Sequence, residues 1–239
     1  MKYIILIGDG MADYPIDELD GKTPLEFAKT PNMDRLAREG TLGLVKTIPD
    51  GYPPGSDVAN LSILGYNPER YYTGRSPLEA VSIGIELEED DVSFRCNLVN
   101  LSRKEGKVIM SDYSAGHIST DEAKEIIYDL DKELTREGIR FYPGVGYRHL
   151  MVWRGGPDDI ETTPPHDISG QEIKEYLPRG DGSDRLINII NRSLSILKNH
   201  PINKKRENDG QAPANSIWLW GQGRAPEMPK IKERYGIDG

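Results

Sequence analysis

The segment Tyr3–Ile7, with the sequence Tyr-Ile-Ile-Leu-Ile, is a continuous apolar run rich in β-branched side chains. Because no polar residue alternates along it, a strand with this sequence needs burial on both faces, which is typical of the parallel sheets of α/β proteins. Gly8-Asp9-Gly10 follows at once. The sequence therefore predicts a layered α/β fold whose first strand carries Asp9 to the carboxyl edge of a sheet, where ligands bind in such folds.

A threonine followed by a proline opens each of two predicted helices, over residues 23–29 and residues 30–40. We expect the second helix to end at Gly40 and to turn three apolar side chains inward, those of Met33, Leu36 and Ala37. Residues 42–48 are the next strand candidate. This order of strand, helix and strand favours a βα-type core.

The rest of the chain predicts further strands and helices. Strands are expected at 92–101 and 107–112 (a hairpin that turns at Lys104-Glu105-Gly106), at 139–142, at 147–153 and at 216–220. An amphipathic helix is expected at 119–137 with a buried face of Ala123, Ile126, Ile127, Leu130 and Leu134, and another helix at 184–198. Residues 155–182 are loosely patterned, and residues 199–214 predict a polar loop.

Composition excludes several classes of protein. The 239 residues carry a net charge of -9, which argues against broad attraction to nucleic acid or to an anionic membrane. A single cysteine, Cys96, excludes an internal disulfide framework and a cysteine-based zinc cluster, so we expect a reducing cytoplasm. No apolar stretch approaches the roughly 20 residues of a membrane span. The sequence leaves the oligomeric state open, a homo-oligomer included.

Asp9 and Ser56 are the first candidates for chemistry. A carboxylate between two glycines at the end of a buried strand suits a hard divalent cation, although Asp9 alone is equally compatible with a turn cap. Ser56 follows the irregular segment 50–55 and lies at the start of a predicted helix, where free backbone N–H groups favour an anion. Metal coordination can activate such a serine as a nucleophile, and the alternative is an ordinary N-cap.

Arginine and histidine side chains in predicted loops form a second group of candidates. Such groups suit a phosphorylated or carboxylate ligand, whereas the alternative for each is a solvated surface residue. The candidates are Arg75, which follows Gly74, together with His117, Arg148, His149 and His166.

Taken together, these segments resemble the alkaline phosphatase superfamily and, within it, the archaeal-type cofactor-independent phosphoglycerate mutases. The most specific block is Pro54-Gly55-Ser56-Asp57-Val58-Ala59-Asn60-Leu61-Ser62 with its continuation to Pro68. Supporting blocks are Gly8-Asp9-Gly10-Met11, Thr30-Pro31-Asn32-Met33-Asp34, Ser114-Ala115-Gly116-His117, Gly146-Tyr147-Arg148-His149, His200-Pro201-Ile202-Asn203 and residues 214–223.

The resemblance implies an enzyme that interconverts 3-phosphoglycerate and 2-phosphoglycerate in glycolysis. It implies two divalent metal ions (manganese, magnesium, cobalt or zinc), no organic cofactor, and a phosphoserine intermediate. By matched position, Asp9 and Ser56 would ligate metal and Ser56 would be the nucleophile. The arginine and histidine candidates (Arg75, His117, Arg148, His149 and His166) would bind substrate.

The resemblance also implies a fold and a division of the chain. We expect a core with a largely parallel sheet flanked by helices, formed by residues 1–85 and 183–239, and an inserted smaller α+β lid at 86–182. The family's remaining metal ligands lie in a C-terminal section with an Asp-His pair, and this sequence contains no Asp-His dipeptide. The core would therefore be incomplete, and we expect no mutase turnover from the 239-residue chain alone.

Two other functions remain open at this point. One is a different metal-dependent phosphatase or phosphotransferase of the same superfamily, because exclusion of water by the lid decides between transfer and hydrolysis. The other is a fragment without catalytic activity that acts as a binding module.

Overall fold

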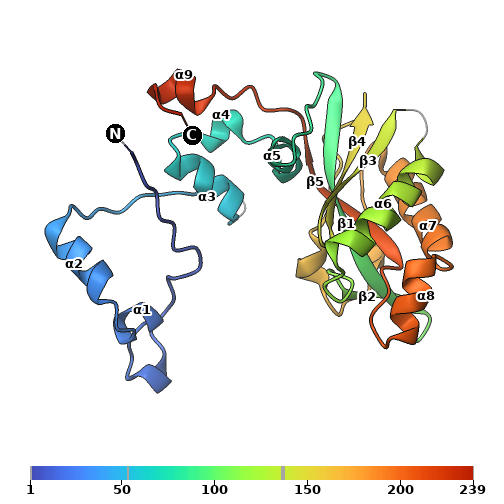
Figure 1. Ribbon diagram of the computed structural model, residues 1–239, viewed down its shortest axis with the longest axis horizontal. Coiled ribbons are helices and arrows are strands. Elements are labelled where there is room, and N and C mark those ends of the chain that lie inside the picture. Colours follow the sequence, from blue (N-terminus) through green and yellow to red (C-terminus); the bar gives the residue numbers. More distant parts are fainter. Residues whose placement is uncertain (1, 53, 136–137, 239) are drawn as a thin grey trace. The chain divides into compact units, whose positions relative to one another are not determined.

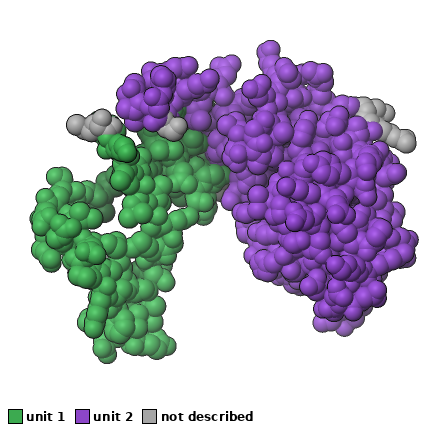
Figure 2. Space-filling view, viewed as in Figure 1, with its two compact units in different colours: residues 1–70 green, residues 71–239 purple. Residues whose placement is uncertain are grey.

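A computed structural model of the protein describes residues 2–52, 54–135 and 138–238. Contacts divide the chain into two compact units, residues 1–70 and residues 71–239 (Figure 2). In the described part of the chain, no helix is both long enough and apolar enough to cross a lipid bilayer.

The first unit contains short helices joined by extended segments. Its elements are the 3-10 helix η1 (Asp17–Leu19) and the α-helices α1 (Pro24–Phe27), α2 (Pro31–Glu39), α3 (Ser56–Ile63) and α4 (Pro68–Tyr71), the last of which ends at the boundary. Thr23 caps α1 as predicted, since its hydroxyl accepts from the Glu26 N–H while the Glu26 carboxylate accepts from the Thr23 N–H. The predicted helix over residues 30–40 is confirmed as α2, which ends before Gly40.

The strands predicted at residues 3–7 and 42–48 are wrong for this structure. Neither segment has strand conformation, and most of their side chains are exposed, with Ile4 91% and Leu6 89% exposed. The face of α2 expected to be buried is also open, since Leu36 is 62% exposed. A strand forms only when a neighbouring strand pairs with its N–H and C=O groups, and no described strand pairs with either segment.

The second unit is built around a five-stranded sheet with strand β1 (Asp91–Lys104) at its centre (Figure 1). Its other strands are β2 (Lys107–Asp112), β3 (Ile139–Val145), β4 (Arg148–Arg154) and β5 (Ser216–Gly223). The strand order is β2-β1-β4-β3, and β5 also pairs with β1. Every pairing between these described strands is antiparallel, so the fold is mixed α/β but this sheet is not the largely parallel one that we expected.

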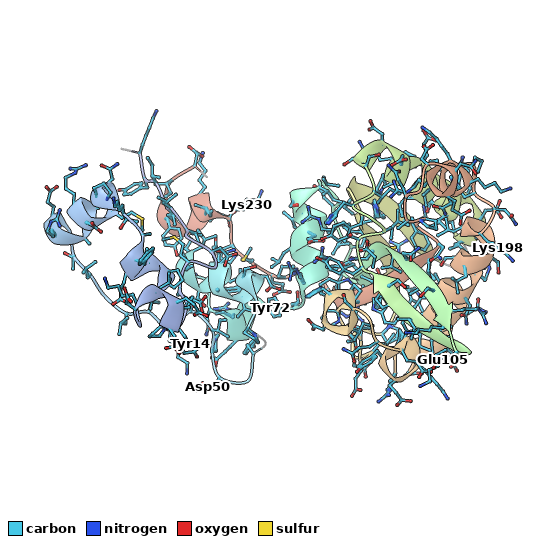
Figure 3. All side chains as sticks on the ribbon, turned by 90° about the horizontal axis from the view of Figure 1, so that it is seen from below. Tyr14, Asp50, Tyr72, Glu105, Lys198 and Lys230 are labelled. Carbon is cyan, nitrogen blue, oxygen red and sulfur yellow. The ribbon has the colours of Figure 1, made fainter. Side chains whose placement is uncertain are left out.

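The predicted β1–β2 hairpin is confirmed, and Glu105 marks its tip (Figure 3). Its two turn residues, Glu105 and Gly106, have positive φ angles of 53° and 79°, as the twist of a two-residue hairpin turn requires. Strands β3, β4 and β5 also lie where the sequence predicts them, although β5 extends to Gly223.

Helices α6 (Thr120–Leu134) and α7 (Ser183–Leu197) pack against one face of the sheet (Figure 1). Ser119 and Glu122 form the capping box of α6, and all five side chains predicted for its inner face are buried. The opposite face packs against two 3-10 helices, η2 (Pro165–Ile168) and η3 (Ile173–Tyr176), through Ile168, Ile173 and Trp218. Helix α5 (Arg75–Ser82) contacts β1 and β5.

The polar loop predicted at residues 199–214 is wrong in part, because it contains helix α8 (Pro201–Asn208). Its sequence signal was the pair His200-Pro201: the His200 ring accepts from the Ile202 N–H, and proline occupies the first helical position. A further short helix, α9 (Ile231–Tyr235), follows β5.

The structure groups residues 183–223 with the segment that we expected to be an inserted lid. Helix α7 and strand β5 share one hydrophobic cluster with β1, β3, β4 and α6, because β5 pairs along the middle of β1. The division into a core of 1–85 and 183–239 and a lid of 86–182 therefore remains a prediction for the whole protein.

Candidate functional site

Asp9 and Ser56 both belong to the first unit. Asp9 is exposed in a turn in which the Met11 N–H donates to the Gly8 carbonyl at 3.3 Å. Ser56 is half-buried and is the first residue of α3, directly after the N-cap Gly55. The predicted position of Ser56 at a helix N-terminus is confirmed, so its hydroxyl lies at the positive end of the helix dipole.

The other predicted site residues belong to the second unit, where aromatic rings connect four of them. We call this group the cation–aromatic cluster: Arg75, Arg95, Tyr113, His117, Tyr147, Arg148, His166 and Trp220. Its rings meet edge to face, with centroid distances of 5.4 Å for His166–Trp220, 6.1 Å for Tyr113–His166, 5.8 Å for Tyr113–Tyr147 and 6.5 Å for His117–Tyr147.

Guanidinium groups lie over the rings at both ends of this cluster. The guanidinium carbons of Arg75 and Arg95 lie 5.7 Å and 4.5 Å from the centroid of the Trp220 ring, and that of Arg148 lies 5.6 Å from the Tyr147 ring. These distances are those of cation–π contacts, which hold a guanidinium in place without using its N–H donors. The donors of Arg75 and Arg148 therefore stay available for a carboxylate or phosphate.

Strand register explains why these residues meet. Arg95 pairs with Trp220 on β5, and Asn97 pairs with Arg148 on β4. Residues two apart on a strand and residues paired across strands point to the same face, so these side chains share the face opposite α6 and α7. The Trp220 indole N–H also donates to the Asn97 side-chain oxygen at 3.1 Å.

Arg95 is 4% exposed, and its Nε lies 2.9 Å from Glu79 Oε2 on α5. Burial lowers the pKa of Arg95 to about 10, the Glu79 carboxylate opposes this shift, and the positive charges of Arg75 and Arg148 add to it. Arg95 therefore remains charged at neutral pH. The neighbouring guanidinium groups make this face of the sheet electropositive, which favours an anionic ligand.

Gly74 sets the start of α5 and with it the position of Arg75. Its φ angle is 145°, and a Cβ atom there would overlap the Gln222 carbonyl oxygen of β5. Because only glycine tolerates both this backbone conformation and this contact, Arg75 begins α5 directly against β5.

His149 lies apart from the cluster. It pairs with Cys96 across β1 and β4, so it points to the face covered by α6 and α7. Its Nδ1 accepts from the Gly144 N–H at 3.0 Å, its Nε2 has no partner among the described residues, and burial lowers its pKa to about 3. His149 is therefore a neutral core histidine in this structure, unlike its exposed neighbour Arg148.

A cavity of about 210 Å³ lies between α5 and the β3–β4 turn. Its lining residues come from those two places: Glu79, Ser82, Ile83, Gly144, Val145, Arg148, His149 and Leu150. Arg148 therefore contributes both to this cavity and to the cation–aromatic cluster.

Comparison with known proteins identifies the family. A family model for 2,3-bisphosphoglycerate-independent phosphoglycerate mutase matches residues 37–203. The chain belongs to this family. A relative from Geobacter sulfurreducens, named as a probable 2,3-bisphosphoglycerate-independent phosphoglycerate mutase, is 57% identical over 239 residues. A relative from Methanosarcina acetivorans, named as a 2,3-bisphosphoglycerate-independent phosphoglycerate mutase, is 54% identical over 242 residues.

Both alignments cover 100% of this chain but only 60% and 59% of the relatives, so the chain spans about three fifths of their length. Two solved structures are similar to this chain, and one of them is named as a mutase of this kind. The PH0037 protein from Pyrococcus horikoshii is similar with a TM-score of 0.68, 30% identity and coverage of 96% of this chain and 53% of that one. The cofactor-independent phosphoglycerate mutase from Thermoplasma acidophilum has a TM-score of 0.55, 28% identity and coverage of 94% and 59%.

This mutase-family chain does not provide a complete metal centre among its described residues. No group of three or more His, Cys, Asp or Glu side chains in the described ranges has the arrangement of a metal site. Asp9 and Ser56 offer oxygen donors of the kind that hard cations prefer, but two donors do not fill the six or more positions of such an ion.

Three residues of the candidate site were not predicted from the sequence of this family member: Arg95, Glu79 and Trp220. A signal for Arg95 existed, because apolar and polar residues alternate from Val92 to Leu98, which places Arg95 on the polar face of the strand. Trp220 gave no comparable signal, since a tryptophan in an apolar strand is normally a core residue. Its place under two guanidinium groups depends on the pairing of β1 with β5.

Proposed function

We propose that the full-length protein is a phosphoglycerate mutase that interconverts 3-phosphoglycerate and 2-phosphoglycerate through a phosphoserine at Ser56. The observation that carries this proposal is the match of the whole chain, at 57% identity, to a relative that bears this name. The gathering of Arg75, Arg148, His117 and His166 on one face of a single unit adds support from the structure.

In this mechanism the Ser56 oxygen attacks the phosphorus of 3-phosphoglycerate. The new bond between Ser56 Oγ and phosphorus forms as the bond to the glycerate oxygen breaks, and the proton of the serine hydroxyl passes to the released alkoxide oxygen. The glycerate then reorients, its 2-hydroxyl oxygen attacks the same phosphorus as the bond to Ser56 Oγ breaks, and the proton of that hydroxyl returns to Ser56. Backbone N–H groups at the start of α3 stabilise the phosphoryl oxygens in both steps.

The cation–aromatic cluster binds the anionic groups of the substrate. Guanidinium groups of Arg75 and Arg148 pair with the carboxylate or phosphate oxygens, and the exposed imidazoles of His117 and His166 add hydrogen bonds. Holding glycerate during its reorientation keeps it available for the return step. Of the five predicted substrate residues, His149 fits this role least, because its ring is buried on the other face, where it orients β4 beside Arg148.

We further propose that Asp9 and Ser56 supply two oxygen ligands to divalent metal, with manganese, magnesium, cobalt or zinc as candidates and two ions as the expected number. Bound metal would lower the pKa of the serine hydroxyl and neutralise charge on the phosphoryl group. The remaining ligands would come from residues beyond those that this chain contributes.

The segments 3–7 and 42–48 would join a largely parallel, alkaline-phosphatase-like sheet in the same full-length protein.

The Ser56→Ala variant tests the nucleophile. In the full-length protein we expect loss of mutase turnover by at least roughly a thousandfold and loss of the phosphoenzyme, because no other group replaces a covalent nucleophile. Turnover is measured by coupled assay, and the phosphoenzyme is measured by mass spectrometry of the peptide that contains residue 56. Ser62→Ala, on the same helix, is the matched control and should retain both signals. Retained turnover in Ser56→Ala would rule out the assignment.

The Asp9→Ala variant tests the metal ligand. Removing one carboxylate from the ion should weaken manganese affinity of the full-length protein by roughly tenfold or more. Isothermal titration calorimetry measures this affinity directly, and Asp13→Ala provides a control from the same exposed segment. Identical titrations for Asp9→Ala and the unsubstituted protein would remove Asp9 from the site.

A further inference from the structure

Arg206 on α8 connects the loop that follows this helix with the turn at Ala115 and with the start of α6. It is 4% exposed, and each of its three nitrogens donates one hydrogen bond. Nη2 donates to the Ala115 carbonyl at 2.8 Å, Nη1 to Glu122 Oε2 at 2.9 Å, and Nε to the Ala212 carbonyl at 3.0 Å. A buried guanidinium that satisfies this many partners fixes their relative positions, because its donors are coplanar and rigid.

The first of these partners belongs to the turn that carries His117. Ala115, Gly116 and His117 have consecutive positive φ angles of 48°, 66° and 50°. Two residues with side chains in the left-handed region are unfavourable without outside support. The Arg206 guanidinium donates to the Ala115 carbonyl, and this hydrogen bond stabilises the left-handed conformation of the turn.

Asp112 supports the same turn from its other side. Its Oδ1 accepts from the Ser114 N–H and hydroxyl at 2.7 Å each, and its Oδ2 accepts from the Gly116 N–H at 2.7 Å. The Ser114 hydroxyl oxygen in turn accepts from the His117 N–H at 3.2 Å. Asp112 therefore organises the turn internally, while Arg206 attaches it to α8.

The second partner of Arg206 ties the turn to the start of α6. The Glu122 oxygen that accepts from Arg206 also accepts from the Ser119 hydroxyl at 2.8 Å, within the capping box of that helix. Burial raises the pKa of Glu122, but hydrogen bonds from Ser119 and the charge of Arg206 outweigh it and lower the pKa overall. The turn is thus fixed at both of its ends.

We propose that Arg206 is a positioning residue for substrate: it holds the left-handed turn 115–117 so that the His117 imidazole stays beside Tyr147 in the cation–aromatic cluster. This inference rests on the proposed function, since it takes His117 as a substrate contact. Arg206 itself does not touch substrate, because its guanidinium is buried and each of its three nitrogens donates to a group of the protein.

Asn203 provides a matched control on the same helix. It is 2% exposed, and its side chain donates to the Leu197 and Ala214 carbonyls and accepts from the Ala214 N–H. Like Arg206 it anchors α8 through buried carbonyl groups, but none of its bonds reaches the turn 115–117. Its replacement therefore reports on the stability of α8 alone.

The experiment compares Arg206→Met and Asn203→Leu in the 239-residue chain. Backbone carbon chemical shifts of Ala115 and His117 report the left-handed conformation, and a titration with 3-phosphoglycerate reports binding. We expect Arg206→Met to shift these carbons toward extended values and to weaken binding about tenfold, the equivalent of one lost charged hydrogen bond. Asn203→Leu should lower the melting temperature but keep the shifts and the affinity.

Other outcomes of this experiment would contradict the positioning role of Arg206 or the proposed substrate contacts. Unchanged carbon shifts in Arg206→Met, or equal changes in Asn203→Leu, would overturn the positioning role. If Arg206→Met does not fold, Arg206→Lys replaces it, because lysine keeps the charge but cannot reach all three acceptors. If the unsubstituted chain does not bind 3-phosphoglycerate, the proposed substrate contacts fail, while the carbon shifts still decide whether Arg206 holds the turn.

Discussion

Arg148 and His149 are neighbours on β4 with opposite surroundings. The alternation of side chains along a strand places the arginine in the cation–aromatic cluster and the histidine in the core beneath α6 and α7. Both residues were candidate ligands in the sequence, and only the strand register separates them. At the scale of single residues, the position along a strand therefore decides whether a polar side chain joins the cation–aromatic cluster or lies in the core.

The buried His149 makes the fold sensitive to acid. Its pKa is about 3 in the folded protein, because burial disfavours the charged ring, against an ordinary value near 6.5 in the unfolded chain. Below about pH 6.5 the unfolded chain takes up a proton that the folded protein does not, so stability is full above that pH and falls as pH decreases. The expected slope is about 1.4 kcal/mol per pH unit at most.

The His149→Gln variant tests this sign. Urea unfolding between pH 6.5 and 5 should show a shallower decrease in the free energy of unfolding for the variant, by roughly 1 kcal/mol per pH unit. Asp112, Glu122 and Asp129, whose pKa values are lowered, lose their stabilising contributions at lower pH, outside this window. Parallel slopes for variant and parent would show that His149 is not the group that titrates.

Elements with local signals could be predicted from the sequence. The helix starts at Thr23 and Ser119 and the hairpin turn at Glu105-Gly106 depend on residues only a few positions apart, and all three lie where the sequence predicts them. The strands at 3–7 and 42–48 did not form, because a strand depends on a partner elsewhere in the chain. The same non-local dependence explains why Arg95 and Trp220 were missed at the site while Arg75 and Arg148 were anticipated.

The capping box of α6 gives a prediction at the scale of one element. Ser119→Ala removes the hydroxyl that accepts from the Glu122 N–H and donates to its carboxylate. We expect a loss of about 1 kcal/mol in the free energy of unfolding, as is usual for an N-cap serine. Urea denaturation measures it, with Ser195→Ala on the exposed side of α7 as a control that should be neutral. A loss of the same size in the control would show that the cap is not responsible.

At the scale of the whole molecule, buried apolar side chains are unequally shared between the two units. Both hydrophobic clusters lie entirely within residues 92–220. In the described part of residues 1–70, the buried hydrophobic side chains are those of Val58, Leu61 and Tyr66, while the apolar segment 3–7 is exposed. Since burial of apolar surface is the main stabilising term, the second unit has what it needs to fold alone.

A protein of residues 71–239 should therefore unfold cooperatively, with a melting temperature within about 5 °C of that of the 239-residue chain. Differential scanning calorimetry measures the transition, and a protein of residues 1–70 serves as the complement and should show no cooperative transition. Removal of the exposed run 3–7 should also reduce binding of an apolar dye, because large exposed apolar patches attract such ligands. A second unit that lost its transition when separated would mean that residues 1–70 contribute to its core, against the distribution of buried side chains.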